Sequence, residues 1–126
     1  MAFTVIRPED RAFQPPKRGD QRRRIAPLSQ ALTHTRANLW RLPPGARGGR
    51  HVEHTQEEMF VVLEGTLTML LGEPPERVDV AAGGLVAVHQ DTALQVRNET
   101  DEELVLFIYG APPVTGKAEF LDDVEL

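Results

Sequence analysis

The chain has 126 residues, of which 40% are hydrophobic, a formal net charge of −5 and no cysteine. This length fits one domain with its own core, the missing cysteine excludes disulfides and thiolate sites, and the acidic balance argues against general nucleic-acid binding. The N-terminus has no basic stretch followed by an apolar one, and no apolar run reaches the ~20 residues of a membrane span. We therefore expect a cytoplasmic protein without nucleic-acid or membrane partners.

The first 35 residues are expected to form an N-terminal arm. Residues 2–6, AFTVI, have the composition of a short edge strand. Residues 8–24 are polar and proline-bearing, and a basic run lies at their end. Because the chain is acidic overall, we interpret this run as solvated and paired with acidic surface, rather than as a nucleic-acid or phosphate site. The basic run comprises Lys17, Arg18, Arg22, Arg23 and Arg24.

From residue 35 onward the sequence is typical of short strands. The side chains of residues 35–42 alternate between two faces as in a strand, with Trp40 and Leu42 on the same face. We therefore expect Trp40 in the core or in a pocket wall. Apolar runs of strand length follow, separated by turns with glycine or proline, and no helix of ordinary length is visible. This pattern predicts an all-β sandwich or barrel. The expected strands are residues 59–63, 66–71, 78–80, 85–88, 93–98 and 104–109.

Residues 45–65, GARGGRHVEHTQEEMFVVLEG, hold a dense group of chemically active side chains. Imidazole and carboxylate groups gathered within eight residues, beside an apolar strand, serve as divalent-metal ligands or as an acid/base pair. The group consists of His51, Glu53, His54, Glu57 and Glu58.

The spacing in this segment resembles the first motif of the cupin family, which runs glycine, five residues, His-x-His, three or four residues, glutamate, six residues, glycine. At the second histidine position this chain has Glu53, with His54 beside it. The other positions of the pattern match at Gly45, His51, Glu58 and Gly65.

Residues 83–98, GGLVAVHQDTALQVRN, resemble the second cupin motif, in which a glycine-led strand and a turn precede a histidine and an asparagine. Asn98 matches the asparagine, whereas Leu94 stands at the histidine position. The resemblance covers residues 36–112 and implies a double-stranded β-helix, or jelly-roll barrel. Residues 113–126 remain as an acidic C-terminal tail.

The resemblance also implies where the candidate site lies. Side chains alternate along a strand, so His51 and Glu53 point the same way, and in the family Glu58 faces the barrel interior with them. One imidazole and two carboxylates hold Mn²⁺, Fe²⁺, Mg²⁺ or Zn²⁺, and the carboxylates favour the harder ions. The alternative is a buried, hydrogen-bonded His–Glu cluster without metal. Leu94 cannot bind metal and makes the pocket drier on its side.

A cavity in the barrel is expected to bind a small molecule. Arg47 and Arg50 flank the glycine loop, where arginines either clamp an anionic ligand or remain solvated. His54 and His89 are expected at the rim or surface, and the sequence around His34 indicates no function for it. The cavity is predicted to be lined by Trp40, His51, Glu53, Glu58, Phe60 and Leu94. The ligand-binding candidates are Trp40, Phe60, Leu94, Asn98 and Arg50.

Three functions stay open at this point. The first is a small-molecule-binding cupin with a degenerate or absent metal site, and the second is a metal-dependent oxygenase, isomerase or decarboxylase. The third is a non-catalytic dimeric sensor or scaffold. Loss of the histidine at Leu94 favours the first and third, whereas His51, Glu53 and Glu58 support the second. Metal analysis of the purified protein separates them.

We also expect a homodimer. Residues 59–63 present an apolar face opposite Glu58 and Phe60, and residues 104–109 are apolar on both faces. One face of each strand fills the barrel, so the other needs a cover that the polar arm and tail do not provide. Exchange of residues 2–6 between subunits would add to this interface. The alternative is an arm that folds back and covers the face within one chain.

Overall fold

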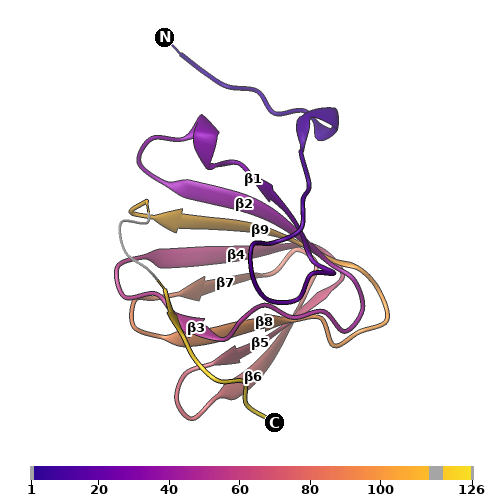
Figure 1. Ribbon diagram of the computed structural model, residues 1–126, viewed down its shortest axis with the longest axis vertical. Coiled ribbons are helices and arrows are strands. Elements are labelled where there is room, and N and C mark those ends of the chain that lie inside the picture. The colour runs from indigo at the N-terminus through magenta and orange to yellow at the C-terminus, as the bar shows by residue number, and fades with distance from the viewer. Residues whose placement is uncertain (1, 114–117, 126) are drawn as a thin grey trace.

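The computed structural model, which describes residues 2–113 and 118–125, is an all-β jelly roll (Figure 1). Two five-stranded antiparallel sheets face each other, in the orders β1-β2-β9-β4-β7 and β10-β3-β8-β5-β6. This architecture confirms the fold predicted from the two motifs. The first sheet contains β1 (Arg24–Pro27), β2 (Arg36–Leu42), β9 (Leu104–Ala111), β4 (Glu57–Glu64) and β7 (Leu85–Val88). The second sheet contains β10 (Glu119–Phe120), β3 (His51–Val52), β8 (Ala93–Arg97), β5 (Thr66–Leu71) and β6 (Glu76–Ala81).

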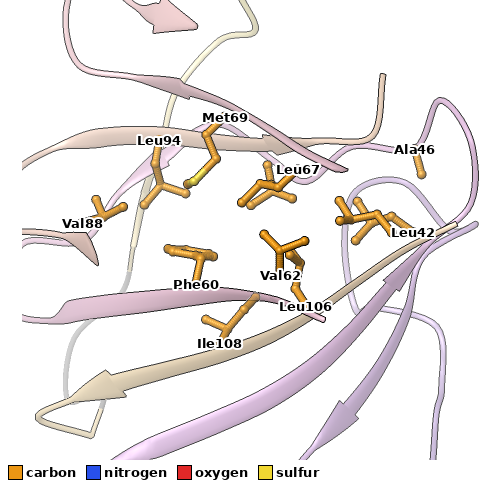
Figure 2. Packing of buried hydrophobic residues seen from close by; sticks show 12 residues of the cluster. Leu42, Ala46, Phe60, Val62, Leu67, Met69, Val88, Leu94, Leu106 and Ile108 are labelled. Carbon is orange, nitrogen blue, oxygen red and sulfur yellow. The ribbon is translucent and has the colours of Figure 1, made fainter. Parts of the chain in front are cut away.

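Alternating side chains of the two sheets fill the space between them. Phe60 of β4 meets Met69 of β5 and Leu94 of β8, so apolar side chains from opposite sheets pack against one another (Figure 2). Burying each such side chain contributes about 1.5–3 kcal/mol. The barrel interior is therefore a packed core. Its other members are Leu42, Ala46, Val62, Leu67, Val88, Val96, Leu104, Leu106 and Ile108.

The N-terminal arm departs from the prediction at its start. Residues 2–6 form no strand, and the Phe3 side chain is 83% exposed. The edge of the first sheet is taken instead by β1, which pairs Ile25 with Trp40, and Gln14 forms a bridge to Ile25 from the other side. The prediction of an edge strand at residues 2–6 was therefore wrong for the isolated chain, because β1 and Gln14 already occupy the edge of the first sheet.

Helical structure in residues 2–113 and 118–125 consists of two single turns, η1 (Pro8–Asp10) and η2 (Ser29–Ala31). Asp10 accepts a hydrogen bond from the Arg7 amide at 3.0 Å, which caps the first turn. No helix in these ranges has the length and apolar character needed to cross a membrane.

Part of the acidic C-terminal tail, strand β10, belongs to the second sheet, whereas residues 114–117 and 126 of the tail lie outside the described residues. Strand β10 pairs with β3, so Phe120 lies opposite His51. Asp123 accepts hydrogen bonds from Gln95, at 3.0 Å, and from Arg47, at 3.2 Å. The arm and the tail therefore each add one strand to the predicted barrel, and their polar groups are used in the fold.

The outer face of the first sheet is apolar and partly open. Leu85 is 58% exposed, Leu63 and Tyr109 are also exposed, and the Tyr109 ring stacks on Phe107 with centroids 6.3 Å apart. The described part of the chain provides no complete cover for this face, so the apolar surface predicted from the strand pattern is present.

Asn98, directly after β8, links three segments of the chain. Its side-chain amide donates to the carbonyl oxygens of Leu42, at 3.0 Å, and Glu102, at 2.7 Å. Its side-chain oxygen accepts from the Thr100 amide at 3.1 Å. These bonds satisfy a side chain that is 1% exposed and hold the end of β2 against the turn before β9.

We predict that Asn98→Ala lowers the free energy of unfolding by about 2–4 kcal/mol, because it leaves several buried polar groups without partners. Urea unfolding of the variant measures the loss. Asn38→Ala is the matched control, since Asn38 is half-buried and makes no side-chain hydrogen bond with the described residues. Equal losses in the two variants would contradict the structural role of Asn98.

Candidate functional site

Three chelating side chains come together between the two sheets. His51 lies on β3, Glu53 follows that strand closely, and Glu58 lies on β4 of the opposite sheet. One ligand atom of each residue lies within 4.8 Å of the others, and His51 Nε2 is 3.8 Å from Glu53 Oε1. The structure therefore brings together the imidazole and the two carboxylates that the sequence predicted to converge.

The imidazole of His51 is held in one tautomer. Its Nδ1 atom lies 2.9 Å from the carbonyl oxygen of Gly49, and a carbonyl only accepts, so Nδ1 carries the proton. In the neutral ring, Nε2 then keeps its lone pair on the side of the Glu53 carboxylate. A backbone carbonyl that fixes the far ring nitrogen is a common support for a metal-binding histidine.

Glu58 carries a buried oxygen atom without a hydrogen-bond partner. The residue is 7% exposed, and its Oε1 atom has no partner among the residues that the structure describes. Burial and the nearby Glu53 carboxylate raise the pKa of Glu58 from 4.5 to about 7, while Arg36 opposes the shift. A divalent cation would supply both the missing partner and the missing positive charge, so this donor set fits a metal.

The glycine-rich loop before β3 sets the geometry around the triad. A Cβ atom added to Gly48 would lie 3.3 Å from the Trp40 ring, and one added to Gly49 would lie 3.2 Å from the Phe120 ring. Larger residues at these positions would displace the two rings. Because the same loop supplies the carbonyl that orients His51, its sequence determines both the aromatic walls and the imidazole.

A pocket of about 410 Å³ opens beside the triad, and His51 and Glu53 form part of its lining. This volume lies within the usual range of small-molecule sites. Trp40 of β2 and Ile25 of β1 line it from the first sheet, and Phe120 of β10 lines it from the second. A larger hollow lies between the arm and η2, but no metal-ligating group of the described residues gathers there. The smaller pocket is therefore the candidate functional site.

Two arginines of the basic run lie over aromatic rings of the pocket. The Arg23 guanidinium carbon is 4.9 Å from the Trp40 ring centroid, and that of Arg18 is 4.4 Å from the Phe120 centroid. Arg23 is 4% exposed and donates to the carbonyl oxygens of Asp20 and Arg18. The prediction of a solvated run is therefore wrong for Arg23, because the arm folds back over the pocket. The local charge pattern gave no signal of this burial.

The pocket wall also differs from the lining predicted by strand parity. Trp40 lines the pocket as expected, whereas Phe60 and Leu94 belong to the packed core and point toward one another (Figure 2). The two sheets lie close enough for these side chains to fill the barrel, which leaves no ligand space between them. Glu58 lies behind the pocket surface formed by His51 and Glu53.

Asn98 and Arg50, the remaining ligand-binding candidates, have structural partners instead. The Asn98 side chain forms the three hydrogen bonds to backbone groups described above. Arg50 is buried, forms an ion pair with Glu73 and donates to the Asp122 carbonyl oxygen at 3.2 Å. Neither residue belongs to the pocket lining within the described ranges.

The remaining histidines lie at the surface, as the sequence predicted for His54 and His89. His54 Nδ1 is 2.7 Å from Asp91 and its Nε2 is 2.9 Å from Glu119, and these carboxylates raise the pKa of His54. His89 Nδ1 lies 2.6 Å from a Glu57 carboxylate oxygen. The exposed histidines are His34, His54 and His89.

Known proteins share both this fold and part of this sequence. A family model of the cupin domain matches residues 38–109. The chain belongs to the cupin family. This cupin keeps the histidine and glutamate of the first motif at His51 and Glu58, whereas Glu53 and Leu94 stand at the other two ligand positions. No curated protein matches the sequence.

Solved structures superpose on this cupin at low sequence identity. A sugar phosphate isomerase from a cupin superfamily, from Silicibacter pomeroyi DSS-3, aligns with a TM-score of 0.82 and 23% identity over 95% of this chain and 83% of that one. The polyketide cyclase RemF from Streptomyces resistomycificus aligns with a TM-score of 0.83 and 12% identity over 98% and 89%. KdgF from Halomonas sp. aligns with a TM-score of 0.74 and 14% identity over 91% of this chain and 96% of that one. At these identities the likeness shows the fold alone.

The raised pKa of Glu58 predicts a pH-dependent stability in the metal-free protein. Unfolded Glu58 ionises near 4.5 and folded Glu58 near 7, so the free energy of unfolding falls as pH rises between these values, by about 3 kcal/mol. Glu58→Gln removes this group's contribution, so its stability relative to the unmodified protein should increase from pH 4.5 to pH 8. Urea unfolding in the presence of chelator measures the difference.

Glu64→Gln is the matched control, because Glu64 lies on the same strand, is exposed, and its side chain makes no hydrogen bond or ion pair with the described residues. Its stability difference from the unmodified protein should stay nearly constant with pH. If Glu58→Gln and the unmodified protein lose stability in parallel across this range, the buried, proton-binding state assigned to Glu58 is wrong.

Proposed function

We propose that this cupin binds a small molecule in the pocket and holds a divalent cation at His51, Glu53 and Glu58. The observation that carries the proposal is the Oε1 atom of Glu58, which is buried without a partner among the described residues and lies in a cluster with a second carboxylate. Keeping two such carboxylates ionised away from water is costly unless a cation lies between them. The donor set is thus better explained by metal binding than by a hydrogen-bonded cluster.

Each residue of the triad has a defined role in this proposal. His51 binds through Nε2, because its Nδ1–H is donated to the Gly49 carbonyl. Glu53 and Glu58 supply charged oxygen donors, which favour Mn²⁺, Fe²⁺ or Mg²⁺ over softer ions. A bound cation would polarise an oxygen of the pocket ligand as a Lewis acid. His51 and Glu53 line the pocket, so the ligand reaches the centre without rearrangement of the core.

An isomerase-type enzyme is the catalytic form of this function that we propose. Two structural neighbours are named as a sugar phosphate isomerase and a polyketide cyclase. In such an enzyme, the cation would polarise the pocket ligand directly, because its ligands His51 and Glu53 line the pocket wall.

A metal-free small-molecule binder is the second candidate, and Leu94 favours it. Leu94 is the register partner of His51, yet its side chain is in the core and provides no fourth ligand. A site with three protein ligands must complete its coordination with water or with the pocket ligand. The two candidates differ in one measurable quantity, the metal content of the purified protein.

We predict about one divalent metal ion per chain when the protein is purified without chelator, measured by inductively coupled plasma mass spectrometry. Glu53→Ala should lower that content at least tenfold, because it removes one of three ligands. Glu57→Ala, which changes an exposed carboxylate close by, should leave the content unchanged. Metal-free protein, or a site that survives loss of Glu53, would favour the binder without metal.

We also propose that the protein is a homodimer whose subunits cover the outer face of the first sheet. Leu63, Leu85 and Tyr109 are exposed on that face. The arm adds further exposed apolar side chains at Phe3 and Val5, which make no strand within their own chain. A two-fold related copy would cover the sheet, and the arm would extend across the partner, as an exchanged segment does.

Light scattering at micromolar concentration should give twice the chain mass of 14.0 kDa. Leu85→Glu places a charge in the proposed interface and should produce monomers. Leu32→Glu is the matched control, since Leu32 is also an exposed leucine but lies beside η2, and this variant should remain dimeric. A monomeric unmodified protein would contradict the proposed interface.

A further inference from the structure

The pocket has an excess of positive charge, although the chain as a whole is acidic. The chain carries 14 basic and 19 acidic residues. The pocket lining contains four cations and one carboxylate, that of Glu53, with Glu58 buried behind it. If a divalent metal binds as proposed, it offsets these two carboxylates, and the excess charge of the wall remains without compensation. The four cations are Lys17, Arg18, Arg23 and Arg36.

Arg36 differs from the other arginines of this wall. The guanidinium groups of Arg18 and Arg23 lie over aromatic rings, and Arg23 also donates to backbone carbonyls. Arg36, at the start of β2, is half-buried, and its guanidinium has neither a hydrogen bond nor an ion pair with any residue in the described part of the chain. A partly desolvated guanidinium with five donors is a strong site for a carboxylate or phosphate.

Arg36 also lies close to the triad. Both Arg36 and the triad residues His51 and Glu53 face the same pocket. A small anion bound to Arg36 would therefore lie within reach of the proposed metal centre.

The remaining walls are flat and apolar. Trp40 lines the pocket from β2, Phe120 from β10, and Ile25 from β1. Aromatic side chains on both sheets suit a ligand with a planar or apolar body, because such surfaces pack closely and exclude water.

We propose that the ligand is a small organic anion, with a carboxylate or phosphate group bound by Arg36 and an apolar body against Trp40 and Phe120, beside the Arg23 and Arg18 guanidinium groups that lie over these rings. This inference rests on the proposed function, since it names the ligand class of the same pocket. Arg36 determines specificity by binding the anionic group, and the aromatic side chains accept the rest of the molecule.

Trp40 makes the proposal directly testable, because it is the single tryptophan of the chain and lines the pocket. Its fluorescence is titrated with benzyl phosphate and phenylacetate, and with their neutral analogues benzyl alcohol and phenylacetamide. We expect saturable changes with at least one anion and about tenfold or greater preference over its neutral analogue. Preference for one anion alone distinguishes a phosphate ligand from a carboxylate ligand.

Three arginine variants identify the residue responsible. Arg36→Gln should lose the preference for the anion, and Arg36→Lys should keep part of it because the charge remains. Arg77→Gln is the matched control, since Arg77 is exposed on β6 and pairs with Asp79, and it should bind as the unmodified protein does. Circular dichroism and thermal unfolding confirm that each variant is folded.

The proposal is overturned if no probe perturbs Trp40, if neutral and anionic probes bind equally, or if folded Arg36→Gln keeps the preference. Metal content is measured on the same samples, so the two proposals fail separately. Metal-free protein with an Arg36-dependent preference would contradict the metal centre and support the anion site. Metal-loaded protein without that preference would overturn the anion site alone.

Discussion

The burial of the Glu58 carboxylate between two sheets is the constraint on which the site depends. In an apolar interior an ionised carboxylate needs a cation or several donors in contact with it, and one oxygen of Glu58 has no hydrogen-bond donor among the described residues. His51 and Glu53 add a lone pair and a second carboxylate beside it. Stability and binding are thus opposed at one residue, because the group that destabilises the metal-free fold is the one that would hold a cation most firmly.

Both ends of the chain complete the environment of this carboxylate. The arm places Arg23 over Trp40, and the tail places Phe120 beside His51, with ring centroids 5.7 Å apart. The glycines between them allow both rings to contact the loop backbone. The barrel predicted from the motifs provides the triad, Trp40 and Arg36, while the segments outside it provide Phe120 and the arginines that lie over the two rings. Selectivity for a ligand would therefore depend in part on segments that the family pattern does not cover.

Sequence reasoning was successful where local rules apply. Two-residue periodicity and motif spacing placed His51, Glu53 and Glu58 on converging faces, and the same periodicity identified the outer apolar face of β4 and β9. It was wrong for Phe60 and Leu94, because parity shows that a side chain points inward but not whether the interior there is core or pocket. The burial of Arg23 depends on contact with a ring seventeen positions along the chain, which no local pattern contains.

The most direct test of the metal centre is a crystal structure of the manganese-loaded protein with anomalous scattering data. One anomalous peak is expected at about 2.0–2.3 Å from His51 Nε2 and from a carboxylate oxygen of both Glu53 and Glu58. Water or a pocket ligand should complete the coordination on the side of Trp40 and Phe120. Crystals grown with excess manganese that show no peak at the triad, and a Glu58 side chain hydrogen-bonded to protein or water instead, would contradict it.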